Sequence, residues 1–62
     1  MNEIPLLLKP DEAARLLGVS RTKVYTLIGR RDIPSIRMGG SIRVPREALE
    51  AWVRANTEAA PA

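Results

Sequence analysis

The sequence contains no cysteine and no histidine among its 62 residues. Without cysteine there is no disulfide bond and no thiolate metal site, and without histidine the other usual zinc ligand and the commonest general base are missing. Catalytic motifs are also lacking, because no serine stands beside a base, no glycine-rich phosphate loop opens a helix after a strand, and the acidic residues form no catalytic pair. These absences predict a protein that is not an enzyme and that uses no metal ion, no cofactor and no small-molecule ligand.

Long hydrophobic runs are missing as well. Leu6 to Leu8 is the nearest approach, and it is far shorter than the roughly 20 residues of a membrane-spanning helix. No basic segment precedes it, as one would in a signal peptide. We therefore expect no membrane association and a cytoplasmic location. The length predicts a single domain, residues 1–62, with an ordered part of about residues 6–56 and loosely held ends.

The charged residues are separated along the chain. Residues 21–46 carry seven basic side chains and one acidic side chain, a net charge of +6, whereas the other residues carry three basic and six acidic side chains, a net charge of −3. A solvated surface normally mixes charges of both signs. The separation therefore indicates a basic face directed at a polyanion such as nucleic acid.

Residues 13–28 have the pattern of two short helices joined by a tight turn, the arrangement of a helix-turn-helix DNA-binding motif. Gly18 can adopt the positive φ that the turn requires, and Ser20 is a good N-cap for the second helix. The pattern by itself is equally typical of a plain helical hairpin. The first helix is expected over Pro10–Leu17. Lys9 is a poor cap for it, Asp11 and Glu12 suit its positive dipole end, and its apolar face is formed by Ala13, Ala14, Leu16 and Leu17.

The second helix is expected from Arg21 to about Arg30. Val24, Leu27 and Ile28 cluster on one side of a helical wheel, and the opposite side is polar and basic. Gly29 marks either fraying near the end of the helix or a close approach of a backbone or of DNA, and we favour fraying. The exposed side is either a solvated helix face or a recognition surface that enters the major groove. In the second case, which we favour, the DNA-binding side chains are Arg21, Thr22, Lys23, Tyr25, Thr26 and Arg30.

Apolar and polar residues alternate on both sides of Gly39-Gly40, which predicts a β-hairpin. Placing all its apolar residues on one core-facing side pairs residue 38 with 42 and 36 with 44, and leaves a three-residue loop. In this register Arg37 lies directly opposite Arg43. Opposed like charges destabilise a sheet, so the pair favours a bound polyanion over an ordinary hairpin. The predicted DNA-binding wing consists of Arg37, Gly39, Gly40, Ser41 and Arg43.

A third helix is expected from about Pro45-Arg46-Glu47 to about Asn56. Leu49, Trp52 and Val53 fall at helical spacing, so we interpret Trp52 as a core residue and not as a platform for stacked bases. The elements together predict a mainly α fold with a small β-hairpin. This is a winged helix-turn-helix with three helices and a two-stranded wing.

The chain is similar to the small winged helix-turn-helix domains of the excisionase family, which are related to the DNA-binding domains of MerR-type regulators. The resemblance rests on EAARLLGVSRTKVYTLI (12–28), DIP (32–34) and IRMGGSIRVPREALEAWV (36–53). The sequence departs from the family pattern at two positions. The family usually has Ser or Thr at the position of Lys9, and at the position of Arg31 it usually has the Gly that ends the recognition helix.

The resemblance implies a bacterial or phage protein that binds double-stranded DNA and associates with the nucleoid when bound. It implies an excisionase, or recombination directionality factor, which binds adjacent sites with cooperative self-contacts, bends DNA and assists a site-specific integrase in excision. A small transcriptional regulator of the same fold is the alternative, and a protein-interaction module is a third hypothesis. MerR-type activators carry a long dimerisation helix and an effector domain that this sequence lacks, so we favour the excisionase.

Overall fold

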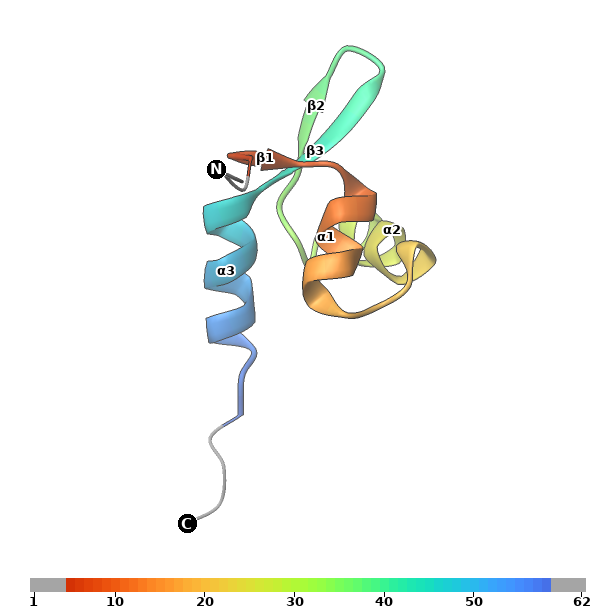
Figure 1. Cartoon of the computed structure of the whole chain (residues 1–62). Coiled ribbons are helices and arrows are strands. Elements are labelled where there is room, and N and C mark those ends of the chain that lie inside the picture. The colour runs from red at the N-terminus through yellow and green to blue at the C-terminus, as the bar shows by residue number, and fades with distance from the viewer. Residues whose placement is uncertain (1–4, 59–62) are drawn as a thin grey trace.

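The computed structural model describes residues 5–58 of the chain, which fold into three helices and a three-stranded antiparallel sheet (Figure 1). This architecture confirms the predicted fold class, a mainly α domain compatible with a winged helix-turn-helix, and adds a short first strand to the expected hairpin. Most of the chain ends that we expected to be loosely held lie outside the described residues. The elements in chain order are β1 (Leu7–Leu8), α1 (Pro10–Leu17), α2 (Arg21–Gly29), β2 (Ile36–Met38), β3 (Ser41–Pro45) and α3 (Arg46–Ala55).

The first helix, α1, has the predicted bounds, and the turn after it has the predicted conformation. Lysine has no hydrogen-bond acceptor and cannot cap a helix, so Glu12 closes the start of α1 instead, its Oε1 accepting a hydrogen bond of 2.8 Å from the backbone N–H of Lys9. At the other end Gly18 has a φ of +73°. The next N–H, that of Val19, donates to the carbonyl of Ala14 at 3.0 Å, which turns the chain sharply toward α2.

The second helix begins at the predicted cap, and it ends at a C-cap that lacks the usual glycine. Ser20 Oγ accepts a hydrogen bond of 3.1 Å from the N–H of Lys23. At the C-terminal end the N–H of Arg31 donates to the carbonyl of Ile28, and that of Asp32 donates to the carbonyl of Leu27. These two bonds form a Schellman motif, which places Arg31 in the left-handed region with a φ of +63°. Arginine therefore occupies a position that favours glycine.

Arg31→Gly is expected to raise the free energy of unfolding by about 1 kcal/mol, because glycine adopts the left-handed conformation without the steric cost of a β-carbon. Urea denaturation followed by circular dichroism measures the change. Arg31→Ala is the matched control, since it removes the same charge and keeps the β-carbon. Equal stabilities of the two variants would show that the gain comes from the lost charge and not from the backbone.

The hairpin has a different register from the one that we predicted. Ile36 pairs with Arg43, Arg37 with Ile42 and Met38 with Ser41, so the loop contains two residues, Gly39-Gly40, and not three. A two-residue hairpin loop requires positive φ at its first residue, and Gly39 has a φ of +61°. The prediction was wrong because it assumed that every apolar residue of the hairpin faces the core. In Figure 1 the hairpin instead projects beyond the helices.

The shift of one residue moves Arg37 and Arg43 to opposite faces of the hairpin. Directly paired residues share a face and successive residues alternate, so Arg37 and Ile42 lie on one face and Met38 and Arg43 on the other. Met38, which we predicted to face the core, is 52% exposed. The predicted opposition of two arginines is therefore wrong, and no repulsion between them favours a bound polyanion.

The hydrophobic core draws on every element except β2. The strand β1 pairs with β3, Leu8 opposite Val44, and forms one edge of the sheet. Trp52 is half-buried and packs against this core, in agreement with its predicted role. No helix within residues 5–58 has the length and apolar character needed to cross a membrane. The buried hydrophobic residues are Leu8, Ala13, Ala14, Val24, Ile33, Val44 and Leu49.

Candidate nucleic-acid interface

The six residues predicted to bind DNA in α2 and directly after it are all exposed, but they do not point in one direction. At about 100° per residue, Thr22, Thr26 and Gly29 occupy the middle of the side opposite the buried Val24. Thr26 Oγ1 donates to the backbone carbonyl of Thr22 at 3.0 Å. The hydroxyl proton is therefore used within the helix. The middle of the exposed side is made of small residues that allow a close approach to a surface.

One edge of α2 carries Arg21 and Tyr25. The Arg21 Nε lies 2.8 Å from Asp11 Oδ1 of α1, and the guanidinium carbon lies 5.5 Å from the centroid of the Tyr25 ring. A hydrogen bond with Tyr25 and, next in size, the charge of Asp11 raise the pKa of Arg21, so this cation stays protonated. Sequence reasoning missed Asp11 as a site residue, because no spacing rule connects side chains on two different helices.

Lys23 lies on the opposite edge of α2, and Arg30, the C-cap residue, continues that edge. Lys23 lines a hollow of about 320 Å³ together with Trp52 and Asn56 of the α3 end, which separates it from the hairpin side of the helix. Arg30 Nε lies 3.5 Å from Asp32 Oδ2 just beyond the helix. These two cations therefore flank the small central residues on the side away from Arg21.

A groove of about 470 Å³ separates α2 from the hairpin. Arg37 and Ile42, which share one face of the hairpin, line it from one side, and Tyr25 and Gly29 line it from the other. A β-carbon added to Gly29 would meet no atom within 4 Å, so internal packing does not require glycine at this position. Two cations, Arg31 and Arg37, line the groove, and its lining contains no acidic residue. The structure thus brings Arg37 together with α2.

The remaining predicted wing residues lie elsewhere on the hairpin. Arg43 is half-buried on the opposite face, and its Nη1 donates a hydrogen bond of 2.9 Å to the carbonyl of Ile42. Gly39, Gly40 and Ser41 are exposed at the tip. The two wing arginines are therefore not equivalent, since only Arg37 faces α2.

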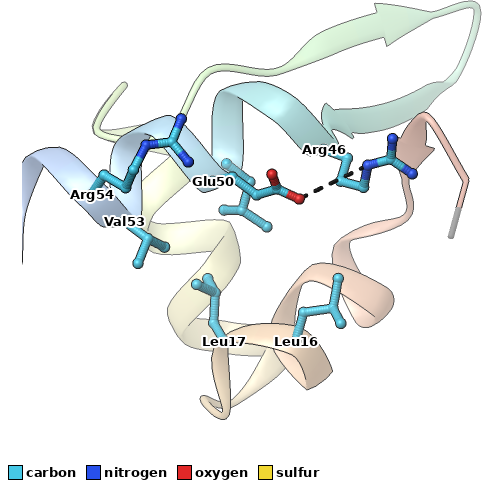
Figure 2. A pocket seen from close by; sticks show the side chains of 7 residues that line it. Leu16, Leu17, Arg46, Glu50, Val53 and Arg54 are labelled. Carbon is cyan, nitrogen blue, oxygen red and sulfur yellow. Dashed lines mark ion pairs between the residues drawn. The ribbon is translucent and has the colours of Figure 1, made fainter.

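A second groove, of about 430 Å³, lies between α1 and α3 (Figure 2). Its floor is apolar, and Arg46 and Glu50 form an ion pair of 3.9 Å along its rim. Leu16, which we placed on the apolar face of the first helix, is 55% exposed at this groove, and Val53 of α3 is exposed as well. The apolar face of α1 is therefore not covered at Leu16, because α3 leaves a hollow above this part of α1.

Residues 7–57 match the family model described as a helix-turn-helix domain. A probable excisionase from Saccharopolyspora erythraea is 44% identical over 47 residues, which cover 76% of this chain and 48% of that protein. An excisionase from Streptomyces ambofaciens is 40% identical over 50 residues, which cover 81% of each chain. The chain therefore spans about half the length of the first relative and most of the second. No solved structure matches the chain.

Proposed function

The chain belongs to the excisionase family of helix-turn-helix DNA-binding proteins, and from this premise we propose that it is a recombination directionality factor. It binds adjacent sites on duplex DNA in a sequence-specific manner, bends the DNA and assists a site-specific integrase in excision. The family is a DNA-binding and non-catalytic class, and we assign strand cleavage to the integrase. The observation that carries the proposal is the groove between α2 and the hairpin, which Arg31 and Arg37 line without an acidic residue.

In the proposed complex α2 lies in the major groove and the hairpin lies along the neighbouring backbone. The small central residues Thr22 and Thr26 face the base edges, where a threonine methyl can contact the methyl group of thymine. Lys23 and Arg30 contact phosphates on one flank of α2. Arg37 and Ser41 contact phosphates on the other flank, with Gly39 and Gly40 allowing a close approach of the hairpin tip to the DNA.

Salt dependence provides the first test of DNA binding. If four or five cations of this surface contact phosphates, the slope of log K against log salt concentration is expected to be about −4, because each phosphate contact contributes roughly −0.9. Gel-shift titrations on a random duplex at several salt concentrations measure it. Absent binding, or binding that salt does not weaken, would contradict a DNA-binding role and favour a protein-interaction module.

The role in excision requires a separate experiment. Footprinting on the DNA that flanks the gene for this chain is expected to show protection of tandem repeats in an attachment site, and a circular-permutation gel assay is expected to show bending. An excision reaction with the cognate integrase should then depend on the chain. Protection of a promoter element alone, with no effect on excision, would assign the chain to transcriptional regulation.

A further inference from the structure

We propose that Arg21 recognises a guanine in the major groove and that Asp11 is the residue that positions Arg21 for this contact. The inference rests on the proposed DNA binding and goes beyond it, because it assigns a base to one side chain and a role to a residue of α1. Arg21 is the first residue of α2. The N-terminal residues of a recognition helix are the ones that contact base edges.

The atoms that form the ion pair determine which N–H donors of Arg21 can still bind a base. A guanidinium has five N–H donors in a planar fork. Asp11 Oδ1 lies 2.8 Å from Nε, so the carboxylate occupies the side of the fork that is nearest the helix. The other four donors belong to the two terminal nitrogens, and in the proposed complex one donor from each of them turns to the base. Two such parallel donors match the O6 and N7 acceptors of guanine.

The charge of the pair favours a base over a phosphate. A phosphate approaching Arg21 meets the carboxylate of Asp11 as well as the guanidinium, so the long-range attraction of the cation is largely cancelled. A guanine edge is neutral and gains the full benefit of oriented donors. An adenine edge presents an N6 donor in place of the O6 acceptor and therefore makes a poorer match.

Tyr25 restricts the same side chain from a second direction. It stands one helical turn after Arg21, and its ring centroid lies 5.5 Å from the guanidinium carbon, within the range of a cation–π contact. Arg21 is therefore held by Asp11 of α1 and Tyr25 of α2 before DNA arrives. A side chain that is already oriented loses less conformational freedom on binding.

The test uses the full chain and a duplex selected from a random pool. Each guanine of the selected site is replaced in turn by 7-deazaguanine, which lacks the N7 acceptor. One replacement is expected to weaken wild-type binding about tenfold. In Asp11→Asn the same replacement is expected to cost about twofold or less, with binding to duplex DNA still salt-dependent. Arg21→Ala should lose the discrimination too, and adding Asp11→Asn to it should change the discrimination no further.

Glu47→Gln provides the matched control, because it removes one exposed acidic charge from α3 and should leave the tenfold discrimination intact. Thermal unfolding by circular dichroism verifies that each variant is folded. A uniform rise in the affinity of Asp11→Asn for both duplexes, with discrimination retained, would overturn the positioning role. A wild type that is insensitive to every 7-deazaguanine would overturn the guanine contact. The absence of any salt-dependent binding would instead refute the proposed function itself.

Discussion

Ile33→Ala is expected to lower the free energy of unfolding by about 3 kcal/mol, the middle of the range for truncating a buried isoleucine. Ile33 is 1% exposed and lies in the segment between α2 and the hairpin. A single hydrophobic core in a domain below about 70 residues rarely supplies more than 3–5 kcal/mol of stability. This single truncation is therefore expected to leave much of the protein unfolded at physiological temperature, with a parallel loss of DNA binding.

Ile36→Ala is the matched control for this prediction. It makes the same substitution three residues later, at a position on β2 that is 41% exposed, and it should cost less than about 1 kcal/mol. Chemical denaturation of both variants gives the comparison, and gel shifts at low temperature show whether DNA binding returns when Ile33→Ala refolds. Equal losses at the two positions would mean that the hairpin packs against the core along its whole length.

Arg37→Ala is expected to weaken binding about tenfold or more on every duplex, because a charge-assisted hydrogen bond contributes about 1.5–3 kcal/mol. A phosphate contact carries no sequence information, so the loss should be uniform. The slope of log K against log salt concentration should become less negative by about 0.9. Titrations on the selected duplex and on a random duplex, each at several salt concentrations, measure both effects.

Arg43→Ala is the comparison variant for Arg37→Ala. The register predicted from sequence makes the two arginines equivalent neighbours, whereas the observed register places Arg43 on the other face, half-buried and bonded to the carbonyl of Ile42. Its removal is expected to change affinity about threefold or less and to leave most of the salt slope intact. Equal effects of the two substitutions would place both faces of the hairpin against DNA. A changed sequence preference in Arg37→Ala would move Arg37 from the backbone to a base.

The helices could be predicted from sequence because their signals act over a few residues. Ser20 caps α2 by accepting a hydrogen bond from the N–H three residues later, and Gly18 supplies positive φ at its own position. The apolar spacing of Val24, Leu27 and Ile28 selects one side of the helix to bury. The bounds of α1 and the start of α2 follow from these local rules, whatever the rest of the chain does.

The hairpin register depended on a choice between two sequence signals. The Gly-Gly dipeptide indicates a two-residue loop, and the alternation of apolar residues favoured a core-facing side with a three-residue loop. The observed hairpin has the two-residue loop. Strand pairing is governed by the turn, while the burial of Ile36 and Met38 depends on whether any element covers the hairpin. In the tertiary structure the hairpin projects past the core, so these side chains stay exposed.

By itself the sequence determined the helix-turn-helix, the Gly18 turn and the Ser20 cap within it, the hairpin and the basic character of residues 21–46. Only the tertiary structure decided which of these residues share a surface. It paired Arg21 with Asp11, turned Arg37 toward α2 and Arg43 away from it, and left Leu16 at a groove. The physical reason is the distance along the chain over which each kind of interaction acts. A cap or a turn is set by dihedral angles and hydrogen bonds within about five residues, whereas contacts between elements depend on how their packed faces cross and on the register of the strands.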